Sequence, residues 1–180
     1  MTTDPSIQAA GDEQPASQPD DTGAEVVVPN QELVKELLDQ MKLRYLVDDD
    51  GDVCAPWENF RTYFMFHGED EQQTFAARTF YERTYSIDDR PRLLDAADDW
   101  NRRTLWPKVY SHTQDDGTVR LIGETQMLVG AGVSLNHFVR STVGWVSAAI
   151  EFDGWLRKQP GMAVDTDQDE GPHDPGQDPA

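Results

Sequence analysis

The segment between residues 132 and 158 constrains the fold of this chain more than any other. Gly132 and Ser134 are suited to begin a helix there, and Pro160 would stop it. Placed at 100° per residue, its apolar side chains cover roughly two-thirds of the circumference, whereas a helix on one sheet face needs about 100° of apolar surface. The sequence therefore predicts a long helix that requires more cover than one sheet provides.

Four aromatic residues form a stripe along this helix at spacings of seven, seven and three: Phe138, Trp145, Phe152 and Trp155. An exposed apolar stripe of this length normally marks an interface. Residues 159–180 are too polar to cover it well, so we expect contact with a second copy of the chain, as a homodimer, or with another protein. Complete burial inside the domain is the alternative.

Residues 29–158 as a whole predict one α+β domain in which an antiparallel sheet packs against helices. Asn30 is a suitable N-cap for a first helix, and a second helix is expected between Asp88 and about Arg103. The expected order is helix, three strands, helix, two strands, helix. Strands are expected near residues 44–47, 60–66, 74–84, 108–113 and 118–127.

Two acidic turns fit this arrangement, one at Asp50-Gly51 and one at Asp116-Gly117. The run from Asp48 onward also raises the question of calcium. An EF-hand loop needs glycine at its sixth position and glutamate at its twelfth, and this run matches neither. We interpret it as a solvated hairpin turn. In the strand near residues 74–84, Phe80 points away from the other apolar side chains, so we expect both sheet faces to be partly covered.

Charge is distributed unevenly along the chain. The formal net charge is -19, and residues 1–28 and 159–180 each hold six acidic residues and no lysine or arginine. Such segments bury too little apolar surface to fold, so we expect two disordered acidic tails. They could act as a decoy for a basic partner, but a role in solubility is favoured. A charge this negative disfavours nucleic acid and anionic membranes as partners.

Seven of the 15 basic residues lie between positions 78 and 108. They could receive an acidic partner segment or the acidic tails. A solvated face balanced by Asp95, Asp98 and Asp99 is the favoured interpretation. The seven are Arg78, Arg83, Arg90, Arg92, Arg102, Arg103 and Lys108.

No motif in the sequence indicates catalysis. Cys54 is the only cysteine, and its acidic neighbours Asp52 and Glu58 would raise its pKa. No phosphate loop, dinucleotide fingerprint or nucleophile elbow occurs, so we expect no catalytic residue, no cofactor and no enzyme activity. A composite metal site is conceivable, but short ligand spacings are missing among the histidines, which are His67, His112, His137 and His173.

The compartment is expected to be the cytoplasm. No apolar stretch approaches the length of a membrane span, and residues 1–5 lack the basic and apolar parts of a secretory signal. A single cysteine also excludes a disulfide within the chain.

A dense group of bulky and polar residues follows the second expected helix. Trp100 and Trp106 can pack beneath the sheet, Asn101 can bond to local backbone, and Pro107 prevents the helix from continuing. We expect these residues, together with Lys108, to be structural rather than to contact a ligand.

The same group carries a resemblance to a known family. With the acidic turn near Gly51, the paired strands around Gly68, and Gly132 before the last helix, it is similar to the YbjN-like family of bacterial proteins over residues 30–158. That family is described as sensory transduction regulators, and its fold is similar to type III secretion chaperones, which commonly dimerise and bind segments of other proteins. The resemblance implies a non-enzymatic, partner-binding role and supplies no catalytic residue.

Two functions remain open at this point. In the first, the chain is a chaperone-like or regulatory protein-binding module whose last helix and exposed sheet face contact partners. In the second, it is a small-molecule-binding domain or a hydrolase with a pocket between sheet and helices, near Cys54 or a histidine.

Overall fold

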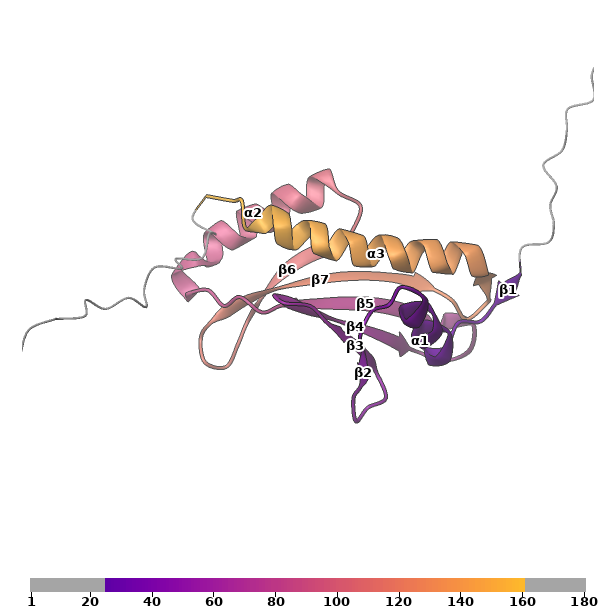
Figure 1. The fold of residues 1–180 in the computed structure, drawn as a ribbon. Helices are drawn as coiled ribbons and strands as arrows, with labels where there is room; N and C mark the ends of the chain where they lie inside the picture. The colour runs from indigo at the N-terminus through magenta and orange to yellow at the C-terminus, as the bar shows by residue number, and fades with distance from the viewer. Residues whose placement is uncertain (1–24, 161–180) are drawn as a thin grey trace, which may run out of the picture.

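The computed structural model of the chain describes residues 25–160 and shows an antiparallel sheet of six strands with three helices (Figure 1). The strand order is β2-β3-β4-β5-β7-β6. The strands are β2 (Leu46–Val47), β3 (Val53–Pro56), β4 (Phe60–His67), β5 (Thr74–Tyr81), β6 (Lys108–Thr113) and β7 (Val119–Leu128). The helices are α1 (Gln31–Gln40), α2 (Arg90–Arg103) and α3 (Leu135–Leu156). The α+β class with three helices and an antiparallel sheet is confirmed.

The helices begin where the sequence places their caps. The side chain of Asn30 accepts a hydrogen bond of 3.0 Å from the amide of Leu33, which satisfies one of the free donors of α1. A proline lies in the first turn of α2, and α3 follows Ser134 directly. Two short 3₁₀ turns complete the chain, η1 (Asp70–Gln72) and η2 (Ile87–Asp89).

Four strands of the sheet, rather than three, lie between α1 and α2, so the expected order is wrong at this point. The missed strand is β3, which is the second arm of the hairpin around Gly51 and pairs with β2 on one side and β4 on the other. Its first three residues are all buried, so it lacks the apolar and polar alternation that reveals a strand exposed on one face. The turn itself is as expected, with Gly51 at φ +87°.

The described chain also begins before the expected domain boundary at residue 29. β1 (Val26–Val27) pairs with β8 (Val133–Ser134) at the start of α3, so this end of the expected tail is ordered. Gly132 allows the approach: it adopts φ +84°, and a Cβ there would lie 2.8 Å from Val26 Cγ1. The rest of the two expected tails, residues 1–24 and 161–180, lies outside the described residues.

All three helices pack on one face of the sheet. Alternate strand side chains point to this face and form two apolar clusters with the helices. Within residues 25–160, no helix covers the opposite face, and its partial cover comes from its own side chains and from the β2–β3 turn, which borders Met65 and Phe80 there. The first cluster holds Phe60, Tyr81, Leu93, Trp100, Val109, Leu121, Phe152 and Leu156, and the second holds Val34, Leu38, Phe64, Phe75, Phe138, Trp145 and Val146.

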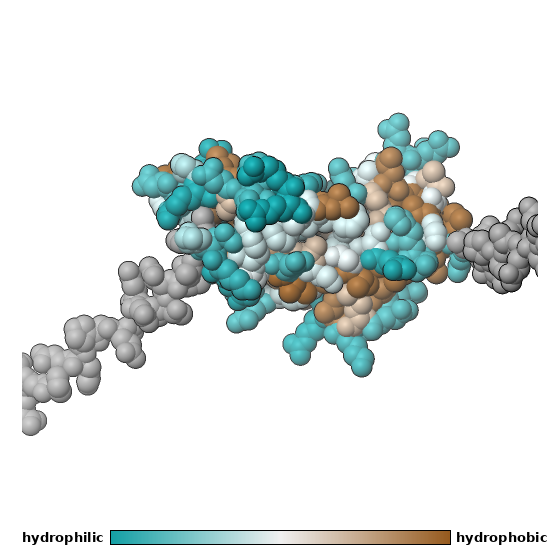
Figure 2. Space-filling view, turned by 90° about the horizontal axis from the view of Figure 1, so that it is seen from above, coloured by the Kyte–Doolittle hydropathy of each residue, from teal (hydrophilic) through white to brown (hydrophobic). Residues whose placement is uncertain are grey.

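The aromatic stripe of α3 lies inside the domain, and the expectation that it is exposed is wrong for three of its four members. Phe138 and Phe152 are fully buried, Trp145 is 3% exposed, and Trp155 is partly buried against the first cluster. The apolar side chains that α3 does expose include Val143 and Ile150, which are seven residues apart. Seen from the helix side, hydrophilic side chains gather over the α2 end and apolar ones toward the β1 end (Figure 2).

Part of the cover that the stripe needed comes from the last turn of α2 and the segment that follows it, whereas Phe138 packs against Phe75 of the sheet. The ring of Trp100 lies 5.0 Å from Phe152 and 5.3 Å from Trp155, and the ring of Trp106 lies 6.1 Å from Trp145. Sheet and flanking segment together enclose more of the helix than one sheet face could. Complete burial, the alternative left open above, therefore holds for Phe138, Trp145 and Phe152.

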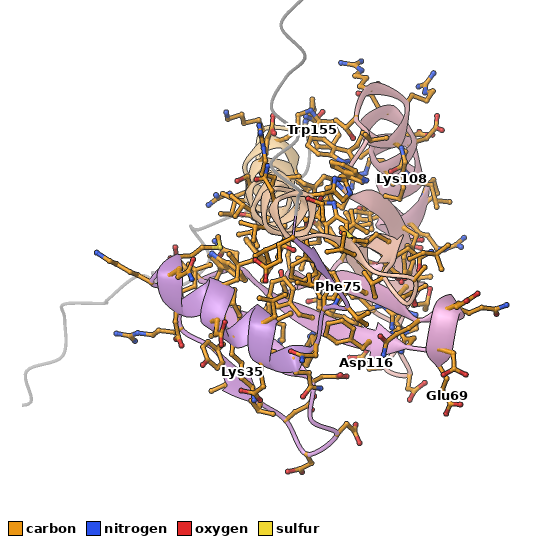
Figure 3. The ribbon with its side chains drawn as sticks, turned by 90° about the vertical axis from the view of Figure 1, so that its right-hand side faces the viewer. Lys35, Glu69, Phe75, Lys108, Asp116 and Trp155 are labelled. Carbon is orange, nitrogen blue, oxygen red and sulfur yellow. The ribbon has the colours of Figure 1, made fainter. Side chains whose placement is uncertain are left out.

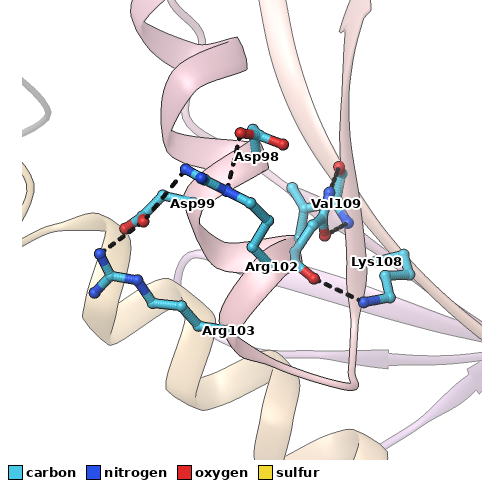
Figure 4. A network of polar contacts seen from close by, with 7 residues as sticks. Asp98, Asp99, Arg102, Arg103, Lys108 and Val109 are labelled. Atoms are coloured by element: carbon cyan, nitrogen blue, oxygen red, sulfur yellow. Dashed lines mark hydrogen bonds and ion pairs between the residues drawn. The ribbon is translucent and has the colours of Figure 1, made fainter.

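Side chains hold residues 100–109, from the end of α2 to the start of β6, to the sheet by hydrogen bonds to backbone groups. We call these residues the α2–β6 junction (Figure 4). The amide of Asn101 donates 2.8 Å to the carbonyl of Val109 and accepts 2.9 Å from its N–H, as a neighbouring strand would. The indole of Trp100 donates 3.0 Å to the carbonyl of Pro107. The ammonium of Lys108 donates 2.9 Å to the carbonyls of Asn101 and Thr104, which lie at the negative end of α2.

Replacing Asn101 should test the junction. We expect Asn101→Ala to lower the free energy of unfolding by about 2 kcal/mol, because it removes two bonds and leaves the backbone of Val109 partly buried without partners. Urea denaturation measures the loss, and amide exchange should show faster exchange at Val109. Arg102→Ala is the control, since its ion pairs are on the surface and should change stability by less than about 0.5 kcal/mol. Equal losses in both variants would contradict the interpretation.

Candidate functional site

The face of the sheet opposite the helices, which we call the open face, is the candidate functional site. Directly paired residues of neighbouring strands share a face, so the pairing register identifies its members. Apolar side chains lie at its centre and charged ones around them. The open face is formed by Cys54, Arg61, Tyr63, Met65, Ala76, Arg78, Phe80, Tyr110, Arg120, Ile122 and Glu124.

The centre of the open face is apolar and is shielded by neighbouring side chains. Met65 and Ile122 are 7% and 6% exposed, although no helix of residues 25–160 covers them. The rings of Tyr63 and Phe80 meet edge to face across β4 and β5, with their centroids 5.6 Å apart. Long arginine stems beside them can cover apolar surface while their charged ends stay in water. The face therefore offers apolar area beneath a thin polar rim.

Ion pairs fix two arginines of this rim. Arg61 lies 2.8 Å from Glu82, and Arg78 lies 3.0 Å from Glu124. Burial alone would raise the pKa of the Glu124 carboxyl, but the bonds that it accepts from Arg78 and Tyr110 outweigh burial and hold that pKa below its ordinary value. Conversely, the bond to Glu124 raises the pKa of Arg78.

A hollow of about 400 Å³ lies on the open face beside the β2–β3 turn. Asp48 and Asp52 line it from the turn, and Arg61 and Arg120 line it from the sheet. Burial, and then the charge of Asp48, raise the pKa of Asp52. The Nε of Arg120 is buried and has no hydrogen-bond partner within residues 25–160. The hollow thus combines a buried guanidinium nitrogen that has no hydrogen-bond partner in the described chain with an apolar floor of Met65 and Phe80.

The residues considered for catalysis do not come together. Cys54 lies on the open face and not between sheet and helices, and burial raises the pKa of its thiol, which opposes a role as nucleophile. His67, His112 and His137 are exposed on three different elements, and His173 lies outside the described residues. Within the described residues, no group of three or more histidine, cysteine or acidic side chains could hold a metal ion.

Three of the seven basic residues of positions 78 to 108 form ion pairs with nearby acidic residues of the same helix region. On α2, Arg102 and Arg103 pair with Asp98 and Asp99 one turn earlier, at 3.1 Å and 2.7 Å (Figure 4). Arg92 pairs with Asp89 in the same way. These arginines are more than half exposed, so the pairs form a solvated surface, as the favoured interpretation has it.

A separate observation concerns membranes: in residues 25–160, no helix has both the length and the apolarity to span one.

The sequence suggested an exposed sheet face as a contact surface but did not identify the residues that form it, although a signal for them is present. Positions 61, 63 and 65 on β4, 76, 78 and 80 on β5, and 120, 122 and 124 on β7 alternate with the core positions. These nine side chains mix arginine, aromatic and aliphatic residues, whereas a fully solvated face would be mostly small and polar. The family motif, by contrast, lies at the α2–β6 junction: Trp100, Asn101, Trp106, Pro107 and Lys108.

Comparisons with known proteins point to one family. A family model described as "YbjN: Putative bacterial sensory transduction regulator" matches residues 30–158. Solved structures similar to this chain include "Crystal structure of YbjN, a putative transcription regulator from E. coli", at a TM-score of 0.56 and 17% identity over 71% of this chain and 91% of that chain. At this identity the likeness shows the fold alone. The comparison with curated proteins found no match.

The Glu124 network gives stability a defined dependence on pH. The folded state lowers the pKa of this carboxyl, so its stabilising effect is complete above the ordinary glutamate value of 4.5 and is lost as the pH falls below it. We expect Glu124→Gln to reduce the free energy of unfolding by about 1 kcal/mol at pH 7. The difference from wild type should shrink between pH 5 and pH 3, measured by urea denaturation. Glu82→Gln, in a pair that is nearly half exposed, should cost less at pH 7. A difference independent of pH would contradict the assignment.

Proposed function

The chain belongs to the YbjN family, and from this premise we propose that it is a non-enzymatic regulatory module that binds another protein chain in the cytoplasm through the open face of its sheet. The proposal includes a chaperone-like mode of action and a homodimer, which the resemblance to type III secretion chaperones implies. It concerns how the domain acts and leaves the identity of the partner to experiment.

One observation carries the proposal, namely that apolar and aromatic side chains occupy the centre of a sheet face that no described helix covers. Phe80 and Tyr63 are partly exposed there, above nearly buried Met65 and Ile122. An apolar centre with arginine and tyrosine around it has the composition of a protein contact. The last helix, which the sequence suggested as a contact surface, contributes less because its aromatic residues are enclosed.

A small anionic ligand is a second candidate for the same face. It is favoured by Arg120, whose buried Nε lacks a partner in the described chain, in a hollow of about 400 Å³. The hollow lies on the side of the sheet opposite the helices, so a pocket between sheet and helices is not needed for this alternative.

Site-specific crosslinking should distinguish a contact face from a solvated one. A benzophenone amino acid at position 80 places the probe on the open face, and the same residue in place of Leu94, an apolar side chain on α2 that is 42% exposed, is the matched control. After irradiation of bacterial cells, we expect position 80 to yield one identified protein, or a second copy of this chain, with the crosslink mapped by mass spectrometry. Position 94 should yield neither.

The homodimer can be tested with the purified chain. We expect sedimentation to show a dimer and Phe80→Glu to weaken its association by at least about tenfold, since a buried carboxylate in an apolar contact costs more than 1.4 kcal/mol. Leu94→Glu should leave it unchanged. A monomer in all three samples, with equal crosslinking at positions 80 and 94, would overturn the proposed function.

A further inference from the structure

We infer that the outer edge of β7 binds an extended segment of a partner protein as an added strand. The inference rests on the proposed protein-binding function and adds a second place of contact and its chemistry. It concerns residues 125–128, beyond the point where β6 stops pairing.

β7 is longer than the strand that pairs with its outer side. β6 pairs with β7 only from Val119 to Glu124. β7 continues to Leu128, and residues Thr125–Leu128 pair with β5 on the inner side. Within residues 25–160, no strand pairs with the outer side of this stretch. It is therefore a short free edge next to a complete sheet.

The hydrogen-bonding direction along this edge follows from Asn101. The N–H and C=O groups of Val109 bond to the side chain of Asn101, so they point away from β7. Val109 and its paired residue Gly123 therefore exchange no backbone hydrogen bonds. Ladder bonds alternate along a strand, so Gln126 and Leu128 direct their N–H and C=O groups away from β5. In the described part of the chain, no backbone group bonds to them on that side.

A hollow of about 480 Å³ lies beside the free edge. It is lined by residues of β7, of β6 and of the loop before β6, namely Glu124, Thr125, Gln126, Lys108, Tyr110, Leu105 and Trp106. The segment before β6 does not pair with β7. Its Pro107 packs over Gly123, where a Cβ added to the glycine would lie 3.1 Å from the proline ring. Leu105 is 67% exposed and Leu128 66% exposed. Apolar side chains therefore border the free backbone groups at both ends.

The geometry selects an extended peptide as the occupant. Only a polypeptide repeats N–H and C=O groups at the spacing of the free edge, which is about 13 Å long for four residues. All neighbouring pairs in the sheet are antiparallel, so we place the segment antiparallel to β7, in line with β6. Its amino end then lies toward Leu128 and the loop that follows.

Charge at that end indicates a basic partner segment. Asp70 and Glu71 on η1 and the preceding Glu69 are exposed, and Gly130 packs directly against the backbone of Asp70 and Glu71. Among the described residues, no lysine or arginine forms an ion pair with these three carboxylates. Figure 3 views the molecule from this end, with Glu69 at the lower right and Lys108 at the upper right. Lysine or arginine at the amino end of the segment complements this surface.

Amide exchange tests the free edge directly. In the protein alone, we expect the amides of Gln126 and Leu128 to exchange at least about a hundredfold faster than those of Thr125 and Met127, which face β5. The probe is a labelled peptide, acetyl-Lys-Lys-Val-Thr-Leu-Thr-amide. Its addition at about 1 mM, suited to a weak contact, should slow exchange at Gln126 and Leu128. Slow exchange in the free protein, or no protection by the peptide, overturns the inference.

Methylated peptides separate strand addition from simple apolar contact. N-methylation of one alternate set of residues removes the donors that face β7 and should weaken binding at least about tenfold, whereas methylation of the other set should not. Replacing both lysines with glutamate should also weaken it. On the protein, Leu105→Ser with Leu128→Ser, which removes apolar area without adding charge, should reduce affinity, and Leu94→Ser should not.

These outcomes are independent of the test of the open face. If both methylated sets bind equally, strand addition is wrong, while crosslinking at position 80 can still support the proposed function. If position 80 gives no specific crosslink but the two edge amides are protected, the proposed open-face contact fails and the edge contact stands.

Discussion

The structure depends on the burial of the aromatic side of α3. Phe138, Trp145 and Phe152 are nearly or fully enclosed, and a single sheet face cannot enclose so wide an apolar surface. The domain meets this need by gathering α1, α2 and the loop before β6 on the same face as α3. The consequence is a one-sided arrangement. Because every described helix lies on the face that α3 occupies, none remains to cover the other face, and the open face results.

The α2–β6 junction links the two sides of this arrangement. Asn101 supplies to Val109 the donor and acceptor that a further strand would supply, so the side chain blocks the sheet edge at that residue. The same junction positions Trp100 against Phe152 and Trp106 against Trp145. Its residues thus contribute to the burial of α3, which gives them a structural role. Where the chain turns at Pro107 within the junction, β7 loses its outer neighbour.

Much of the fold can be predicted from local signals, and the failures share one cause. Asn30, Pro91 and the glycines at 51 and 117 mark helix starts and turns because their effects act within a few residues. The position of Trp100 and Trp106 against α3 depends on residues about 40 to 55 positions apart, and helical periodicity contains no information about it. β3 was missed because its burial removes alternation. An exposed sheet face was expected, but its full set of side chains is identified only once the register of five strands is known.

The charges of the domain give the two proposed contact surfaces different chemistry. The formal charge of the chain is -19, yet Arg61 and Arg78 on the open face are each neutralised by a glutamate, so this face attracts a partner by apolar area more than by net charge. The free edge of β7 ends near three carboxylates that form no ion pair in the described chain, so it favours a basic segment. A partner that uses both surfaces needs an apolar patch and a basic strand, and both must be present for the combined affinity. Recognition by two unlike contacts would allow a small acidic domain to discriminate among the many basic segments in a cell.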